Sequence, residues 1–427
     1  MYLCNVFYYY SNQQYMIPFE KYKLDNGLTV ILHKDVNTPI AAVNITYNVG
    51  SRDENPNRTG LAHLFEHLMF GGSKNIPKYD EPLQRVGGEN NAFTSSDITN
   101  YYLTLPVQNL ETAFWLESDR MNELAFSKKS LDNQRNVVIE EFKQSYLNQP
   151  YGDAMLLLSP LAYKVHPYQW NTIGKNIEQI AATSMDEVKE FFYTFYAPNN
   201  AVLSVSGNID IDKTKTLIDK WFGTIPARKQ YHRNLPQEPI QTEVRILEVE
   251  REVPVNCLYK AYKMGKRLDD NFYTIDLISD ILSNGDSSRL QQVLVKEKQL
   301  FSSINAYISG TFDDGLFIFH GYLTPEISFQ QAEEALLEEW EKLKTNFISE
   351  RELEKVKNRV KTVLYYSELQ GQDKAMNLCI AEIMADAALV NEEESKYDAV
   401  TPDNIYAESN KILKESSCST LYYKAKV

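Results

Sequence analysis

The chain has 427 residues, with 44 Lys or Arg and 58 Asp or Glu, so its formal net charge is −14. Nucleic acid or an anionic membrane surface as main partner requires a basic footprint, so this charge argues against both. Hydrophobic residues make up 43% and charged residues 24%, which is typical of a globular protein. No apolar run is long enough for a transmembrane helix, so we expect no membrane partner.

The N-terminal segment and the cysteines favour a cytoplasmic protein. Residues 1–16 lack a basic start, a continuous apolar stretch and a small-residue cleavage site, so they are a poor signal peptide. We interpret them as a lead that is either disordered or upstream of a true start at Met16. The four cysteines are scattered and form no CxxC pair, which favours reduced thiols over disulfides or a cysteine metal site.

Hydrophobic periodicity predicts alternating groups of strands and helices along the first half. In chain order we expect strands at 20–33 and 39–49, helices at 59–71 and 79–87, strands at 91–95 and 99–105, helices at 108–123, 128–147 and 184–195, a strand at 200–207 and a helix at 212–221. The second half shows a similar mixture, with a long helical stretch over 326–395.

The chain contains an internal repeat. Residues 39–52 (PIAAVNITYNVGSR) and 254–267 (PVNCLYKAYKMGKR) share Pro, Tyr, Gly and Arg at the same positions without a gap. A strand-like run precedes each segment and a helical pattern follows it. We predict an α+β fold of two homologous halves, each an antiparallel β-sheet with helices packed on one face. The expected domains are a zinc-binding half at 17–226, a linker at 227–241 and a metal-free half at 242–427.

The first predicted helix of the first half carries the motif H-x-x-E-H. His63 and His67 are four residues apart, so both imidazoles project from one helix face and suit one tetrahedral metal ion. Glu66 lies beside them, within an otherwise apolar segment where polar groups need partners. At the same offset, the second half has Ile278, Ile281 and Leu282. A purely structural face can therefore be aliphatic, which favours a functional reading over a pair of packed core histidines.

A third metal ligand is expected from another helix. Glu141 has Val137 and Val138 one turn before it, which places it on the apolar stripe, whereas Glu140 has polar neighbours. An acidic residue on a buried stripe needs a partner, so we prefer Glu141 as the ligand. The alternative is a solvated acidic pair on the helix surface.

Together these residues resemble the pitrilysin-type (M16, inverzincin) metallopeptidases, whose signature is H-x-x-E-H followed by a distal Glu. The segment before the distal Glu, NVVIEE, the opening FEKYKLDNGLTVILHKD, the stretch at 87–102 and SSRL at 287–290 extend the resemblance over nearly the whole chain. The resemblance implies one Zn²⁺ per chain, held by His63, His67 and Glu141, with Glu66 as the general base of peptide hydrolysis. The segment 89–94 is typical of a short strand that could pair with an extended peptide by β-augmentation, which predicts Asn91, Ala92 and Phe93 as substrate-binding residues. The resemblance supports Asn91 and Ala92, and a plain core strand is the alternative, especially for Phe93.

Two departures from the family pattern affect these expectations. Gln134 stands where the family often has a second Glu, and it can still act as a neutral group behind the ligands. Val295 and Ser302 stand where self-sufficient members carry an Arg and a Tyr, although Tyr307 could replace the latter with a gap. We therefore expect a heterodimer with a homologous subunit that supplies Arg and Tyr, with a homodimer as the second choice. A non-catalytic scaffold or processing subunit and a structural zinc site are the remaining alternatives.

Overall fold

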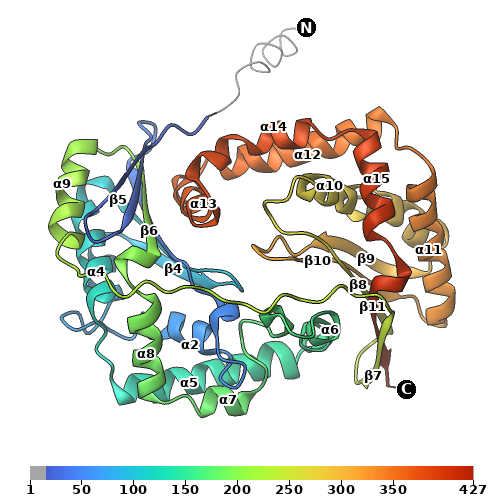
Figure 1. The fold of residues 1–427 in the computed structure, drawn as a ribbon, viewed down its shortest axis with the longest axis horizontal. Coiled ribbons are helices and arrows are strands. Elements are labelled where there is room, and N and C mark those ends of the chain that lie inside the picture. The colour runs from blue at the N-terminus through green and yellow to red at the C-terminus, as the bar shows by residue number, and fades with distance from the viewer. Residues whose placement is uncertain (1–15, 427) are drawn as a thin grey trace, which may run out of the picture.

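The computed structural model describes residues 16–426 (Figure 1). The predicted N-terminal lead, residues 1–16, therefore lies outside the described range except for Met16. The choice between Met1 and Met16 as the start residue concerns the same segment. Two β-sheets stand on opposite sides of the molecule, and the segment that connects them, 227–241, contains no helix or strand. The predicted α+β class with two sheet-containing halves is confirmed.

Each sheet contains strands from one half only. The first has the order β1-β2-β6-β3-β5-β4 and the second β7-β11-β8-β10-β9. The strands of the first sheet are β1 (Glu20–Lys23), β2 (Thr29–Lys34), β3 (Ile40–Tyr47), β4 (Glu89–Thr94), β5 (Thr99–Pro106) and β6 (Ala201–Gly207). Those of the second are β7 (Arg245–Arg251), β8 (Cys257–Lys263), β9 (Phe301–Ile308), β10 (Leu316–Leu323) and β11 (Cys418–Ala425). Apart from β1, the two orders are the same when β2 to β6 are matched to β7, β8, β9, β10 and β11 as the repeat requires.

The sheets are mixed rather than wholly antiparallel. β2 pairs with β6 in parallel, and the equivalent β7 and β11 do the same, while the remaining pairs are antiparallel. Sequence periodicity does not distinguish the two directions, because alternation is a property of one strand and not of its neighbour. The strand expected at 20–33 is a hairpin of β1 and β2, because Gly27 takes a φ of +90° in the turn between them.

The helices of the first half are α2 (Leu61–Leu68), α3 (Asp80–Arg85), α4 (Leu110–Asn122), α5 (Lys128–Phe142), α6 (Ala154–Ala162), α7 (Ile177–Ala181), α8 (Met185–Phe195) and α9 (Ile211–Phe222). Those of the second are α10 (Phe272–Ser283), α11 (Phe329–Thr345), α12 (Glu350–Ser367), α13 (Gly371–Met384), α14 (Glu393–Asp398) and α15 (Pro402–Ile412). α6 and α7 were not predicted from the sequence, and the helical stretch predicted at 326–395 is divided into four α-helices. None of the helices within 16–426 is both long and apolar enough to cross a membrane.

The two halves exchange one helix each. α13 of the second half packs on the first sheet, and α6 of the first half packs on the second sheet, so each sheet has helices on both of its faces (Figure 1). The α13 contact includes Cys379, fully buried, with its thiol 3.4 Å from the Val202 carbonyl oxygen. Lys374 adds a buried ion pair with Asp35 at 2.8 Å. The expectation of helices on a single face is therefore incomplete. We propose 17–226 and 242–427 as domain boundaries, with these two helices as the exception.

Candidate metal centre and substrate strand

Helix α2 presents His63 and His67 on one face. Gly60 precedes the helix with a φ of +85°, and a Cβ there would approach the Ile173 carbonyl oxygen to 2.8 Å, so only glycine fits this start. Phe65 on the opposite face is fully buried and holds the helix on the core. The two imidazole rings lie 4.9 Å apart between centroids, at 85° to one another. Their nitrogens can therefore converge on a single point.

Helix α5 brings Glu141 to the same point. Its carboxylate oxygens lie 3.8 Å from His63 Nε2 and 3.6 Å from His67 Nε2. Within residues 16–426 this is the one cluster of three or more His, Cys, Asp or Glu side chains that could hold a metal ion, and its ligand atoms lie within 4.8 Å of one another. The structure thus brings together the three side chains that the sequence singled out.

The apolar stripe predicted beside Glu141 is only partly present. Val138 is fully buried, but Val137 is 49% exposed, so the apolar stripe does not extend along that side of α5. Glu141 is itself half-buried, and its side chain is 40% exposed. Glu140 lies on the surface and pairs with Lys143 at 2.6 Å. The position of α2, and not burial in a stripe, distinguishes the two glutamates.

The chemistry of this cluster fits a zinc ion. Burial, with a smaller contribution from the neighbouring His67, lowers the pKa of His63 to about 4. His63 is therefore neutral at ordinary pH, which is the form that binds metals. Two neutral imidazoles and a carboxylate are the ligand set of catalytic zinc sites, which keep a fourth position open. His67 and Glu141 are the more exposed members, so the cluster is accessible from one side.

Glu66 lies next to the cluster but is held by a different element. Its Oε2 accepts a hydrogen bond of 2.5 Å from the Thr94 hydroxyl, at the end of strand β4. Burial raises the pKa of Glu66, and the bond from Thr94 partly opposes the rise. A carboxyl whose pKa is raised toward neutral is suited to accept and release a proton. Sequence reasoning missed Thr94, because nothing in one strand signals which helix residue its side chain will meet.

Strand β4 is an edge strand with one open side. It pairs with β5 alone, and it contains the three predicted substrate residues Asn91, Ala92 and Phe93. The Ala92 N–H donates to the side-chain oxygen of Asn91 at 2.8 Å. We infer that this N–H faces the open edge, where a peptide carbonyl could replace the amide oxygen. An open edge is what β-augmentation requires. The substrate role of these residues stays a prediction.

Gln134 lies on α5 two turns before Glu141 and is half-buried. Among the described residues it makes no hydrogen bond to the three clustered side chains. The role expected for Gln134, a hydrogen bond to one of the proposed metal ligands, is therefore not supported by a contact. It stays a prediction.

The second half offers no cationic or phenolic group at the two predicted positions. Val295 packs against the core of the second half, and Ser302 donates to the Tyr322 carbonyl oxygen at 3.3 Å. Tyr307, the possible replacement, packs with its ring 6.0 Å from that of His320, on the sheet face that α6 covers. Its side chain is therefore already engaged in packing.

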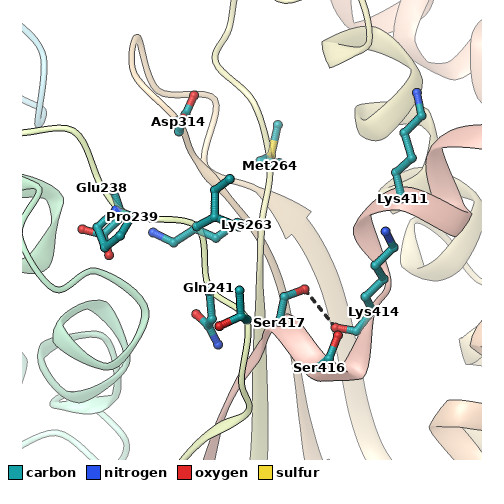
Figure 2. Close-up of a pocket in the computed structure, with 12 residues that line it drawn as sticks. Glu238, Pro239, Gln241, Lys263, Met264, Asp314, Lys411, Lys414, Ser416 and Ser417 are labelled. Carbon is teal, nitrogen blue, oxygen red and sulfur yellow. Dashed lines mark hydrogen bonds between the residues drawn. The ribbon is translucent and has the colours of Figure 1, made fainter.

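A separate pocket of about 460 Å³ lies between the linker and the end of α15 (Figure 2). In Figure 2 the amine of Lys263 extends toward Glu238, away from Lys411 and Lys414 on the other side. The three cations do not converge on one point, so they do not form an anion site. Gln241, which also lines the pocket, fixes the linker by a 2.9 Å hydrogen bond to the Cys418 carbonyl oxygen.

Comparisons with known proteins agree with this fold. Residues 29–170 match the family model described as Insulinase (Peptidase family M16), and residues 183–360 match the one described as Peptidase M16 inactive domain. The chain is 27% identical to the zinc protease PqqE of Helicobacter pylori, over 96% of this chain and 94% of that protein. It is 29% identical to the uncharacterized zinc protease YmxG of Bacillus subtilis, over 82% of this chain and 84% of that protein.

The solved structures include a protease from Helicobacter pylori that is 27% identical, with a TM-score of 0.89, and the match covers 96% of this chain and 100% of that one. The two sheets, their shared topology and these matches together define a peptidase-type fold of two halves. The chain belongs to the M16 peptidase family.

Proposed function

We propose that this chain is a zinc-dependent endopeptidase that cleaves peptides or small unfolded polypeptides, as the catalytic subunit of a dimer that encloses a chamber. The convergence of His63, His67 and Glu141, with ligand atoms within 4.8 Å of one another, carries this proposal. A structural zinc site would need a fourth protein ligand, and within 16–426 the cluster has three.

The proposed roles follow from the positions of the side chains. A zinc ion held by His63, His67 and Glu141 would polarise the scissile carbonyl and make water a better nucleophile. Thr94 occupies Oε2 of Glu66 and leaves Oε1 free to take the proton of the attacking water and to deliver it to the leaving amine. A peptide paired with β4 would lie beside this carboxylate, because Thr94 ends that strand.

Replacing Ala92 with Pro should weaken peptide binding. The change removes one N–H from the open edge of β4, and the backbone there is already extended, as proline requires. The loss of one hydrogen bond is worth about 1 kcal/mol, so kcat/KM for a peptide should fall about fivefold, mainly through KM. Steady-state kinetics on a fluorogenic peptide measures this.

Two controls accompany the Ala92→Pro variant. Zinc content and melting temperature should match the unchanged protein, because the substitution touches neither the metal cluster nor the β4–β5 ladder. An unchanged KM would show that the peptide does not pair with this edge.

The proposed partner is a homologous chain that lacks H-x-x-E-H and supplies an Arg and a Tyr. Support comes from Val295 and Ser302, which have neither a positive charge nor a phenol, and from Tyr307, whose ring is packed. Such a pair of side chains would clamp the peptide backbone opposite the zinc. A homodimer remains the second choice.

The isolated chain is therefore expected to have little peptidase activity. Mixing it with the homologous product of a neighbouring gene should restore activity, and a metal chelator should remove it again. Light scattering on each sample gives the oligomeric state beside the rate. Full activity from the chain as a homodimer or monomer would contradict the heterodimer.

The alternative is a non-catalytic scaffold or processing subunit. The family model that matches residues 183–360 is described as an inactive domain, which is consistent with this alternative. Such a subunit would bind its partner normally after replacement of Glu66. We also propose a cytoplasmic location. The described cysteines Cys257, Cys379 and Cys418 are free and buried, as expected for a reducing compartment.

A further inference from the structure

One buried carboxylate outside the metal cluster holds the beginning of helix α2. Glu54 is 6% exposed, and its Oε1 accepts a hydrogen bond of 2.8 Å from the Ala62 N–H. Its Oε2 accepts from the Gly60 N–H at 3.0 Å and from the Trp170 indole N–H at 3.1 Å. Nothing in the roles assigned to the metal cluster uses this residue.

The contacts explain why a carboxylate is needed there. The first N–H groups of a helix have no partner within the helix, and the residue before α2 is Gly60, which has no side chain to cap them. Glu54 supplies the missing acceptors from outside, and a negative charge at a helix N-terminus is favourable. Burial raises the pKa of Glu54 to about 8, and the three hydrogen bonds oppose the rise. All three hydrogen-bond partners of Glu54 are donors, so each of them favours the ionised form and opposes the effect of burial.

The segment that carries Glu54 is also attached to the substrate strand. The N–H groups of Ser51 and Arg52 donate to the carbonyl oxygens of Ser95 and Ser96, at 3.2 and 3.0 Å, in the turn between β4 and β5. The Trp170 indole donates to the Ser51 carbonyl oxygen at 2.9 Å as well as to Glu54. Residues 50–54 therefore connect the start of the helix that bears both histidines to the end of β4.

The same segment contacts the second half of the chain. The Arg52 side chain is 3% exposed, and its Nη1 lies 2.8 Å from Asp97 Oδ1 and 2.7 Å from Asp313 Oδ2. Asp97 follows β4, and its Oδ2 also accepts from the Phe312 N–H at 3.0 Å. Separating Arg52 from these carboxylates would leave a buried charge without a partner, which is strongly unfavourable. The ion pairs therefore hold the segment in one position.

We propose that Glu54 is a positioning residue that fixes α2 relative to β4, and with it the zinc ligands and Glu66 relative to a bound peptide. The proposal rests on the proposed function, because it assigns Glu54 to that same site. Glu54 touches neither the substrate nor the metal, and it acts through the backbone of α2.

The test is Glu54→Gln, compared with a matched control. Gln keeps the size of the side chain but turns one acceptor oxygen into an NH₂ group that faces N–H donors. The control is Asp276→Asn, which alters a half-buried carboxylate that accepts from the Tyr397 hydroxyl at 2.5 Å on α10, the helix equivalent to α2 in the second half. Both variants turn one carboxylate oxygen into an NH₂ group, and only the first affects the attachment of α2.

Three measurements separate positioning from general destabilisation. In the metal-free protein, amide hydrogens in the first turn of α2 should exchange faster in Glu54→Gln and not in Asp276→Asn. With Co²⁺ bound in place of zinc, the visible spectrum of Glu54→Gln should change and that of the control should not. In the assembled enzyme, kcat should fall about 100-fold, the loss that a displacement of about 1 Å causes, with a smaller change in KM.

Equal exchange, spectra and kcat in the two variants would overturn the positioning role. If Glu54→Gln does not fold, Trp170→Phe decides. This variant removes the indole N–H that donates to Glu54 and to the Ser51 carbonyl, and it leaves the bonds from the Gly60 and Ala62 N–H groups. It should shift the spectrum and kcat in the same direction by less, and no shift would overturn the proposal. Failure of the proposed function is distinguishable, because it would appear in the unchanged protein as absent cobalt binding and absent peptidase activity, whereas the exchange measurement needs no metal.

Discussion

Replacing Glu66 with Gln is expected to abolish most peptide hydrolysis while zinc stays bound at one ion per chain. The Gln side chain keeps the shape of Glu and can still accept the hydrogen bond from Thr94, so α2 and β4 should not move. Gln cannot take a proton, and loss of a general base lowers rates by about 10²- to 10⁴-fold. Peptidase assays on the assembled enzyme and metal analysis of the same sample measure both effects.

The control for the Glu66 prediction is a substitution of Thr94, whose hydroxyl donates a hydrogen bond to the Glu66 carboxylate. Thr94→Val removes the hydroxyl and leaves the base, so activity should fall by less than in Glu66→Gln and zinc should again be retained. Zinc loss in Glu66→Gln would show that Glu66 is a ligand. Activity at the normal rate would exclude it as the base and would favour the scaffold alternative.

Replacing Glu141 with Gln should remove the metal itself. The carboxylate lies 3.6 to 3.8 Å from the two imidazole nitrogens, and a neutral amide is a much poorer zinc ligand than a carboxylate. Zinc affinity should fall by more than about 100-fold, the upper range for groups that only support a ligand. Activity should then fall to background. Competition with a chromophoric chelator measures the affinity.

The neighbouring residue provides a matched control for Glu141. Glu140→Gln makes the same chemical change one position away, where the side chain pairs only with Lys143 on the surface. Affinity, activity and stability should stay within about 0.5 kcal/mol of the unchanged protein, as for ordinary surface substitutions. If the two variants reversed these results, Glu140 would be the ligand and α5 would have to be rotated relative to α2.

Local patterns in the sequence were sufficient for much of the fold. The strand at 201–207 and the helix at 185–195 lie within one residue of their predicted bounds, because alternation and helical period are properties of a single segment. The repeat was sufficient to anticipate two similar sheets. α6 and α7 were not predicted. The parallel direction of the pairs β2–β6 and β7–β11 could not be predicted from the sequence of either strand alone.

The sequence by itself determined that His63, Glu66 and His67 share one short helix, because residues three and four apart lie on one face whatever surrounds it. Only the tertiary structure decided what meets that face. It brought Glu141 from α5, although half of its supposed apolar stripe is exposed. It also placed Thr94 against the side chain of Glu66 and Glu54 at the start of α2. The exchange of α6 and α13 was also decided there. These contacts join residues far apart in the chain, and they depend on how whole elements pack, which no local period records.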